Sequence, residues 1–401
     1  MDPIAELGAR PAHLCPMTDF LKRRWFRTLL IGIALLFTGA TTLANAQQTF
    51  RSSAGDVTVE TVASGLEHPW AIAFLPDGRM LVTERPGRLR IVTRDGTLSP
   101  PVAGVPLVNT QKQSGLLDVV LDRDFPNNRT IYFCFAEPVD GGGRTALARA
   151  RFIEETVAKL VDVELIFRQD GPPSTGNHCG CLIAQGGDNN LFLTMGDHEG
   201  FREETQNLTN HIGKIVRIRP NGTVPSDNPF VGWPNSKPEI WSYGHRNSQG
   251  AMIHPQSGKL WIHEHGPRGS DEVNIPLAGR NYGWPVIGYG TEYSGEKIHA
   301  SAHTEGMEQP IWVGSIAPSG MAIYTGEFFS VWKGSLFIGG LSSQRLVRLE
   351  LDGESVVTEE HLLTNLGARI RDVRQGPDGA LWLLTDDLAG RILRLVPAPQ
   401  D

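Results

Sequence analysis

A six-fold internal repeat constrains the fold of this chain more than any other feature of its sequence. Each copy joins short apolar segments through turns rich in glycine, proline, aspartate or asparagine. Apolar segments separated by such turns are typical of antiparallel β-meanders. The copies span residues 69–92, 115–137, 181–197, 249–266, 319–351 and 370–395. A single meander cannot bury both of its faces, so repeated meanders are expected to stack on one another.

Meanders that stack around a common axis form a β-propeller, and the number of copies sets the number of blades. The sequence therefore predicts an all-β fold, a six-bladed β-propeller of four-stranded antiparallel blades. The alternative is a β-sandwich or barrel in which the similarity of the segments is accidental. The 45 glycines and 27 prolines among 401 residues suit a turn-rich β protein. Long connections at 138–180 and 197–248 are the places where a propeller usually carries a site.

The first 46 residues have the pattern of a secretory signal peptide. A basic segment precedes an apolar stretch at 28–37, and residues 44–46 form an A-x-A cleavage site. The apolar stretch is too short to cross a membrane comfortably. We therefore predict that residues 1–46 are removed and that 47–401 form one propeller domain. This predicts a periplasmic protein that is not integral to a membrane; the alternatives are an uncleaved anchor, a twin-arginine signal and a start at Met17.

Charge and cysteine content narrow the function classes further. The formal net charge is −7, and no long basic run follows the N-terminus, which argues against a nucleic-acid partner. Cys15 falls in the predicted leader, which leaves an odd number of cysteines and predicts no disulfide framework. We expect Cys134 to be a core thiol, and Cys179 and Cys181 to be free thiols that are buried or nearly so.

His178 stands directly before these two cysteines, in the run HCGC. Such a run could bind zinc or copper, but these sites need a further pair of ligands nearby, and His198 is the only candidate. If 180–184 is a strand, Cys179 and Cys181 share one face and His178 lies on the other. We interpret His178 as a catalytic residue; a metal ligand and an inert core histidine are the alternatives.

Three arginines near the starts of two separate repeats form a second candidate cluster. Arg246 and Asn247 lie in the polar run GHRNSQG, and Arg369 and Arg371 alternate at the start of a strand, so both should point to one side. A guanidinium group binds carboxylates through a planar fork. The arginines would suit a ligand with several carboxylates if they converge at the propeller axis. The alternative is that each one caps a loop or pairs with an aspartate such as Asp372.

The loop at 264–285 combines glycine, proline and acidic residues in the run EHGPRGSDEVN and ends in NYGWP. Exposed carbonyls at Gly266 and Pro267 and the carboxylate of Glu272 are hard oxygen ligands, which calcium prefers to nitrogen or sulfur. The spacing is not that of an EF-hand. A plain polar loop is the alternative interpretation.

Taken together and in this order, these stretches resemble the soluble dehydrogenases for aldoses and glucose that depend on pyrroloquinoline quinone (PQQ). These relatives are six-bladed propellers of the bacterial periplasm, and the resemblance extends over residues 57–396. It is carried by QSGLLDVVLDRDF, TGNH, LFLTMGD, HIGKIVRI, GHRNSQG, EHGPRGSDEVN, NYGWP and RIRDVRQGPDG. The chain looks most similar to the aldose sugar dehydrogenase branch.

The resemblance implies a role for each matching residue. His178 corresponds to the general base that takes the proton of the anomeric hydroxyl, and Asp197 to the acidic residue that orients it. The implied cofactor contacts are Gln113, Arg246, Asn247, Tyr293, Leu341, Ser342, Arg369 and Arg371.

Calcium is the second implied cofactor. The main-chain carbonyls of Gly266 and Pro267 correspond to ligands of a calcium ion that activates PQQ, and Glu272 and Tyr282 to a second, structural calcium site. The implied reaction oxidises an aldose at C1 to its lactone and passes electrons to an external quinone, cytochrome or dye. A calcium-dependent lactonase or other hydrolase and a non-catalytic propeller that binds a ligand are the alternatives. Either a monomer or a homodimer is consistent with the sequence.

The chain departs from the family pattern beside the expected base. The family usually has an aromatic residue, glycine, a small residue and arginine after the histidine, whereas this chain has Cys179, Gly180, Cys181 and Leu182. Ser342 stands where some relatives have a lysine. We expect these changes to alter the packing of the substrate and to weaken the binding of the cofactor.

Overall fold

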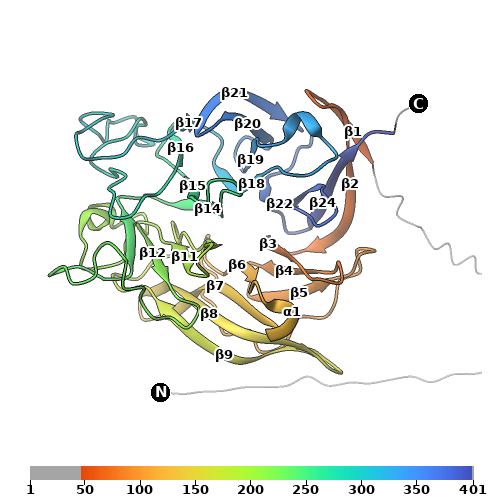
Figure 1. The fold of residues 1–401 in the computed structure, drawn as a ribbon, viewed down its shortest axis with the longest axis horizontal. Coiled ribbons are helices and arrows are strands. Elements are labelled where there is room, and N and C mark those ends of the chain that lie inside the picture. Colours follow the sequence, from red (N-terminus) through yellow and green to blue (C-terminus); the bar gives the residue numbers. More distant parts are fainter. Residues whose placement is uncertain (1–46, 400–401) are drawn as a thin grey trace, which may run out of the picture. The chain divides into compact units, whose positions relative to one another are not determined.

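The computed structural model describes residues 47–399. The signal peptide predicted at 1–46 therefore lies outside the described residues. The described part is nearly all β, and its strands form six antiparallel sheets arranged as the blades of a six-bladed propeller (Figure 1). The predicted fold class is confirmed. Within residues 47–399, no helix is long and apolar enough to cross a membrane.

Each repeat of the sequence forms one blade. Blade one contains β3 (Pro69–Phe74), β4 (Met80–Glu84) and β5 (Arg88–Val92); blade two contains β6 (Leu116–Leu121), β7 (Thr130–Val139), β8 (Gly142–Glu154) and β9 (Ala158–Arg168). Blade three contains β10 (Ile183–Gln185), β11 (Leu191–Thr194), β12 (Lys214–Ile218) and β13 (Ile240–Tyr243). Blade four contains β14 (Ser248–Ile253), β15 (Leu260–Glu264), β16 (Asp271–Asn274) and β17 (Trp312–Gly314).

The remaining strands complete the ring. Blade five contains β18 (Pro318–Ile323), β19 (Leu336–Gly340), β20 (Leu346–Asp352) and β21 (Ser355–Leu362); blade six contains β22 (Ile370–Gln375), β23 (Leu381–Thr385) and β24 (Gly390–Pro397). Short helical turns are α1 (Phe125–Asn128), η1 (Arg202–Gln206) and η2 (Ser330–Trp332).

The ring is closed by strands from both ends of the described chain. β2 (Gly55–Leu66) pairs antiparallel with β24, from Val57 opposite Pro397 to Leu66 opposite Gly390. β1 (Gln48–Ser52) then adds a further strand to the same sheet. Blade six therefore takes its outer strands from the N-terminal side, and blade one keeps only three strands and an isolated bridge between Val92 and Leu98. β2 directly precedes blade one in the chain but is a strand of blade six, so its pairing with β24 joins the first blade to the last.

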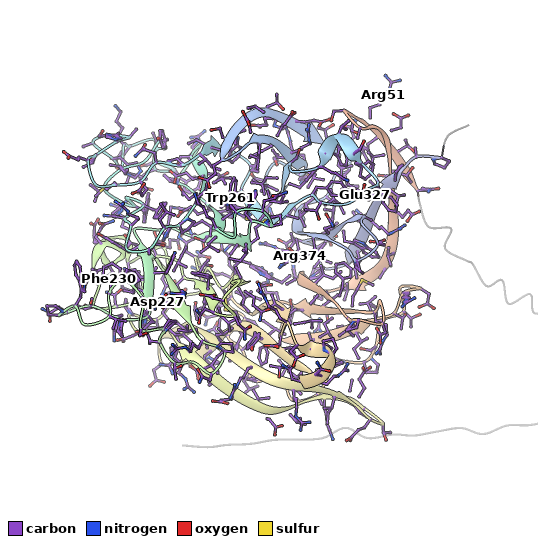
Figure 2. The ribbon with its side chains drawn as sticks, in the orientation of Figure 1. Arg51, Asp227, Phe230, Trp261, Glu327 and Arg374 are labelled. Atoms are coloured by element: carbon purple, nitrogen blue, oxygen red, sulfur yellow. A yellow bond between two sulfur atoms is a disulfide. The ribbon has the colours of Figure 1, made fainter. Side chains whose placement is uncertain are left out.

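The inner strands make the wall of the central axis. They contact one another in the order β3, β6, β10, β14, β18 and β22, and β22 contacts β3. Arg374 of β22 lies near the centre of the ring, whereas Arg51 and Asp227 lie at its periphery (Figure 2). The Arg374 guanidinium binds Asp118 of β6 at 3.0 Å and so links two inner strands that are not neighbours. Connections that precede inner strands meet at one end of the ring, because Gln113, before β6, and Asn247, before β14, both bind the segment before β10.

Apolar side chains fill the space between neighbouring blades. The largest hydrophobic cluster includes Trp70 of blade one, Phe133 and Leu147 of blade two, and Ile183 and Leu193 of blade three. Each blade thus buries both of its faces against its neighbours, which is what a lone meander cannot do. The short, continuous apolar segments of the repeats are explained by this arrangement, because a strand buried on both faces is apolar on both.

One cysteine prediction is wrong. Cys134 of β7 and Cys181 form a disulfide with a Cα–Cα distance of 5.6 Å, and Cys179 is a buried free thiol. The bond joins blade two to the segment that enters blade three, so the pairing depends on how the blades pack. The premise of a strand at 180–184 is also wrong, because β10 begins at Ile183.

Candidate functional site

His178 and Asp197 form a buried pair at the end of the ring where the inner strands begin. His178 lies in the connection before β10, and Asp197 follows β11. The His178 Nδ1 atom lies 2.6 Å from Asp197 Oδ1. An ionised carboxylate only accepts hydrogen bonds, so Nδ1 of the neutral ring carries the proton and Nε2 is left as the basic atom. The pair therefore has the arrangement of a general base with its orienting carboxylate.

The carboxylate of this pair is held ionised. Burial opposes the charge on Asp197, but the hydrogen bond of His178, the charge of Arg246 and the backbone N–H of Glu199 are among the influences that outweigh burial and lower the pKa of Asp197. The Asp197 Oδ1 atom also accepts the backbone N–H of Glu199 at 2.8 Å. Oδ2 accepts the indole N–H of Trp284 at 2.9 Å. Both oxygens are thus engaged, and the orientation of the carboxylate is fixed.

The segment that carries His178 has an unusual backbone. His178, Gly180 and Cys181 have φ values of 49°, 63° and 82°, in the left-handed region that costs non-glycine residues about 1–3 kcal/mol each. The Gln113 Oε1 atom accepts the backbone N–H of His178 at 3.1 Å, and Asn247 Oδ1 accepts that of Gly180 at 3.3 Å. Two of the predicted cofactor residues therefore also hold the segment that presents His178.

Arg369 and Arg371 point to the same side, as the alternation predicts. Both donate to Asp386 Oδ2, at 3.1 and 2.9 Å. Arg371 is buried, and its guanidinium lies 4.0 Å from the centre of the Trp70 ring. The alternative that an aspartate pairs with the arginines thus applies, with Asp386 in place of Asp372. This pairing leaves one carboxylate between two guanidinium groups and a net positive charge.

Arg246 approaches the His178–Asp197 pair from blade four. Its main-chain carbonyl accepts the backbone N–H of Asp197 at 2.8 Å, and its Nη1 donates to the carbonyl of His265 at 2.9 Å. Its guanidinium lies 5.3 Å from the centre of the Trp284 ring. Arg246 is linked to Arg371 through Asn247 and Gln249, because Gln249 Nε2 donates to Asn247 Oδ1 at 3.1 Å and Oε1 accepts from Arg371 at 3.4 Å.

Three buried donors in this network have no acceptor among the described residues: Arg246 Nε, Asn247 Nδ2 and Arg371 Nε. A buried donor without an acceptor costs about 1–3 kcal/mol, and more when it is charged. An anionic ligand with several oxygens would satisfy such donors. The side chains brought together here therefore fit a polycarboxylate cofactor.

The residues predicted to bind calcium are also brought together. Gly266, Pro267, Glu272 and Tyr282 line one small cavity of about 20 Å³ together with Glu264. Burial, followed by the charge of Glu264, raises the pKa of Glu272 to about 8. The carboxyl groups of Glu264 and Glu272 beside main-chain carbonyl oxygens are a donor set that suits a hard cation, although the Pro267 carbonyl also accepts from the N–H and hydroxyl of Ser270, both at 3.2 Å. Within residues 47–399 no group of three His, Cys, Asp or Glu side chains is placed to hold a metal, so main-chain oxygens would be required.

Four further residues that the sequence analysis predicts to bind the cofactor or calcium have no observed contact of that kind. The Tyr282 hydroxyl donates to the carbonyl of Ile275 at 2.6 Å and is therefore already engaged. The atom of Tyr282 that would bind a metal is thus its main-chain oxygen. Tyr293 is 77% exposed on the loop after β16, and Ser342 is exposed beside the buried Leu341. The Leu341 carbonyl lies 3.5 Å from Arg369 Nη1. Tyr293, Leu341 and Ser342 thus remain predictions as cofactor contacts.

The model of the family described as Glucose / Sorbosone dehydrogenase matches residues 66–394. The chain belongs to this family. It is therefore an oxidoreductase of the sugar dehydrogenase type, and the resemblance stated from the motifs is confirmed.

Individual relatives of this sugar dehydrogenase agree with the family match. Aldose sugar dehydrogenase YliI of Escherichia coli is 44% identical over 347 residues, which cover 85% of this chain and 93% of the relative. The apo structure of the soluble aldose sugar dehydrogenase from Escherichia coli is similar with a TM-score of 0.82 at 43% identity, over 85% of this chain and all of that one. The PQQ-bound aldose sugar dehydrogenase of Streptomyces coelicolor is similar with a TM-score of 0.71 at 28% identity, over 84% of this chain and 98% of that one.

The sequence reasoning missed three side chains of the candidate site: Trp70, Trp284 and Asp386. Trp284 stands in the motif NYGWP, but nothing in the motif shows that its indole contacts the carboxylate of Asp197, 87 residues earlier in the sequence. Asp386 directly follows β23, and its position at the site end of that strand is the signal that could have identified it. The zinc or copper alternative loses a ligand, because the Cys181 sulfur is bonded to Cys134.

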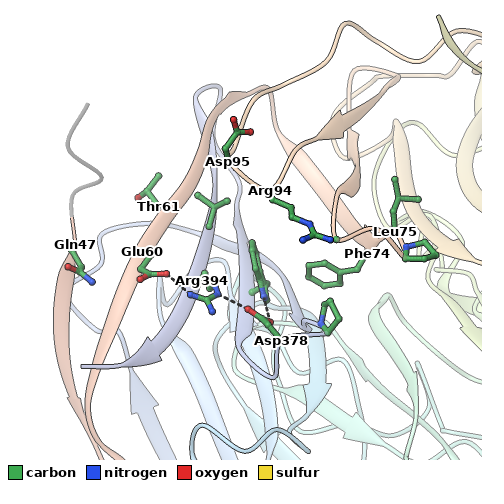
Figure 3. Close-up of a pocket in the computed structure, with 14 residues that line it drawn as sticks. Gln47, Glu60, Thr61, Phe74, Leu75, Arg94, Asp95, Asp378 and Arg394 are labelled. Atoms are coloured by element: carbon green, nitrogen blue, oxygen red, sulfur yellow. Dashed lines mark hydrogen bonds and ion pairs between the residues drawn. The ribbon is translucent and has the colours of Figure 1, made fainter. Parts of the chain in front are cut away.

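A large cavity lies elsewhere and is not the candidate site. It has a volume of about 910 Å³ and lies where β2 and β24 meet the turns after β3, β5 and β22 (Figure 3). Its Arg394 binds Asp378 and Glu60, both at 2.7 Å. These charges satisfy one another, whereas Arg246 Nε and Asn247 Nδ2, next to the segment of His178 and Asp197, have no acceptor among the described residues. We therefore place the candidate site around the His178–Asp197 pair, where buried hydrogen-bond donors lack acceptors, and not at the larger cavity.

Proposed function

We propose that this protein is a PQQ- and calcium-dependent aldose sugar dehydrogenase. It oxidises the anomeric hydroxyl of an aldose to a lactone and transfers the electrons to an external quinone, cytochrome or dye. The observation that carries the proposal is the His178–Asp197 pair beside buried arginine and asparagine donors that have no acceptor among the described residues. The PQQ-bound relative from Streptomyces coelicolor supports the choice of cofactor.

The residues present fit both implied groups. Arg246, Asn247 and Arg371 would hold the carboxylates of PQQ through their free donors. The main-chain oxygens of Gly266 and Pro267 would bind the calcium that activates PQQ, and Glu272 and Tyr282 would bind a second, structural calcium. When bound, PQQ supplies the two-electron acceptor, and calcium polarises it as a Lewis acid.

The chain itself supplies the proton chemistry. His178 Nε2 accepts the proton of the anomeric hydroxyl while the C1–H bond is broken. Asp197 keeps the proton of the neutral ring on Nδ1 and stabilises the imidazolium ion that forms. Asp197 is 1% and His178 8% exposed, so this carboxylate acts on the ring largely out of contact with water, where its charge is stronger.

We propose the periplasm as the location and residues 47–401 as the mature protein. This proposal is supported by the basic, apolar and A-x-A segments at the N-terminus of the sequence. The mature protein would act as a monomer or a homodimer. N-terminal sequencing of protein isolated from the periplasm tests the cleavage position.

The central experiment uses purified protein without cofactor. We expect dye reduction with a panel of aldoses to require added PQQ and Ca²⁺, and His178→Gln to lower kcat about 10²–10⁴-fold, the usual contribution of a general base. Thermal unfolding of His178→Gln controls for misfolding. No PQQ binding by titration, together with no activity, would refute the proposal.

A non-catalytic binding protein is the second candidate. It is favoured by the buried thiol of Cys179, which stands where the family usually has an aromatic residue. PQQ binding without turnover of any aldose would support this candidate over the dehydrogenase.

A further inference from the structure

Trp284 joins two parts of the site that no motif connects. It lies in the long connection between β16 and β17, and its side chain is buried, with 8% of its surface exposed. Its indole N–H donates to Asp197 Oδ2 at 2.9 Å, on the other side of the carboxylate from His178. Hydrogen bonds to an ionised acceptor are stronger than those between neutral groups. The contact therefore restrains the carboxylate that orients the base.

The same indole ring also supports Arg246. The guanidinium lies 5.3 Å from the ring centre, within the range of a cation–π interaction. The main chain of Arg246 binds the backbone N–H of Asp197 at 2.8 Å. One side chain thus contacts both the carboxylate behind the base and an arginine that the proposed cofactor would meet.

Trp284 is itself held by its main chain. Its N–H donates to the carbonyl of Gly244 at 2.9 Å. Its carbonyl accepts from Thr205 Oγ1 at 2.6 Å and from Gln206 Nε2 at 2.7 Å. The buried Lys214 binds the carbonyl of Thr205 at 2.8 Å and so fixes that turn. The indole is therefore presented from a rigid support, as a group that positions another must be.

We propose that Trp284 is a positioning residue of the dehydrogenase, which acts on His178 through Asp197. This inference rests on the proposed function. A carboxylate held at Oδ1 alone can rotate about its Cβ–Cγ bond, whereas the N–H of Trp284 at Oδ2 fixes the plane in which Oδ1 faces His178. The fixed plane keeps the proton on Nδ1 and leaves Nε2 free to act as the base.

Trp284→Phe is the variant that isolates this role, because it keeps an aromatic ring under Arg246 but removes the N–H. We expect kcat with saturating PQQ and Ca²⁺ to fall about tenfold or more, as for loss of a hydrogen bond to a charged group. KM for the aldose should change little, since the indole N–H is engaged by Asp197. In an Asp197→Ala background the same change should have no further effect on kcat, because the two residues act as one unit.

Trp382→Phe is a matched control. The Trp382 indole also donates to a carboxylate, that of Asp378 at 3.0 Å, and an arginine, Arg394, also lies over its ring at 5.9 Å. Its exposed fraction is 9%, close to that of Trp284. This unit lines the cavity of Figure 3, near the start of β23, whereas the site lies at the end of that strand. The control should leave kcat unchanged while it carries the same cost of losing a buried N–H.

A second readout does not depend on activity. Nitrogen-15 NMR of the imidazole in cofactor-free protein distinguishes the tautomer protonated at Nδ1 from that protonated at Nε2. We expect His178 to be protonated at Nδ1 in the unmodified protein, and a mixture of tautomers in Trp284→Phe. If Trp284→Phe does not fold, Thr205→Val removes one hydrogen bond to the Trp284 carbonyl and should shift the tautomers in the same direction.

The outcomes separate this inference from the proposed function. Inactive unmodified protein refutes the dehydrogenase, and the tautomer measurement still tests the effect of Trp284 on His178. Active protein in which Trp284→Phe leaves both the tautomer and kcat unchanged overturns the positioning role. Equal losses in Trp284→Phe and Trp382→Phe, or multiplied losses in the Asp197→Ala background, overturn it as well, since they indicate general destabilisation.

Discussion

Removing the Cys134–Cys181 disulfide should weaken the fold and the site together. The bond spans 47 residues of sequence and joins blade two to the segment that enters blade three. The chain-entropy model gives roughly 4 kcal/mol for closing a loop of this length. Because domains are stabilised by about 5–15 kcal/mol in total, a loss of this size is a large fraction of the whole.

The effect on the site follows from the backbone of the same segment. Cys181 lies three residues after His178, and both have positive φ values, 82° and 49°. Such a conformation persists only when its surroundings hold it. Without the covalent link, only hydrogen bonds and packing hold the segment, among them those that Gln113 and Asn247 accept and that of the Cys181 N–H to the carbonyl of Thr194 at 2.7 Å. We therefore expect activity to fall at denaturant concentrations well below those that unfold the remaining blades.

The assay compares urea unfolding and dye reduction with and without a dithiol reductant. The Cys134→Ala/Cys181→Ala variant should resemble the reduced protein and should no longer respond to reductant. Cys179→Ser is the matched control, because it removes the neighbouring buried thiol, which contacts Ser114 at 3.2 Å, and keeps the bond. Thiol counting on the denatured protein should detect the thiols of Cys134 and Cys181 after reduction but not before it. Detection of both before reduction, or an unchanged midpoint after it, would refute the reasoning.

Two further predictions concern charges of the site. Asp386→Ala leaves the buried Arg371 without its carboxylate and should lower the free energy of unfolding by about 3–5 kcal/mol. Added PQQ should raise the melting temperature of this variant more than that of the unmodified protein. Equal increases in the two proteins would contradict this prediction. Burial and Glu264 raise the pKa of Glu272 from 4.5 to about 8, so folded protein without calcium should lose stability as pH rises through this range. In urea titrations with a chelator, Glu272→Gln should remove this loss of stability at higher pH. Calcium should bind the unmodified protein more tightly at higher pH, and an affinity for calcium that does not depend on pH would contradict this prediction.

The repeated blades could be predicted because their signal is local. In the last copy, the segment IRDVRQ and the apolar run ALWLL lie on either side of the turn GPDG, and two short segments joined by such a turn indicate a hairpin. The closure of the ring had no such signal, because β2 pairs with β24 across the length of the chain. The disulfide was missed for the same reason, since its partners meet only when blades two and three pack.

The site was predicted unevenly for a related reason. His178 and Asp197 were assigned by resemblance, and the geometry brings them within hydrogen-bonding distance. The partners of the arginines could not be read from the sequence, because Asp386 reaches Arg371 through the pairing of β22 with β23. Spacing along one strand showed which arginines share a side, but not which carboxylate from the next strand meets them.

The departures beside His178 can now be interpreted together. Cys179, Cys181 and Leu182 are all buried, and Leu182 belongs to the hydrophobic cluster between blades three and four. Cys179 faces Ser114, and Cys181 is bonded to Cys134. These side chains are therefore directed into the core, where a disulfide and apolar packing hold the strained segment from within. On this argument the unusual run is a different way of supporting His178, and altered substrate packing need not follow from it. The kinetics of Cys179→Ser, set against those of the disulfide variant, separate the two interpretations, since only the disulfide should affect kcat.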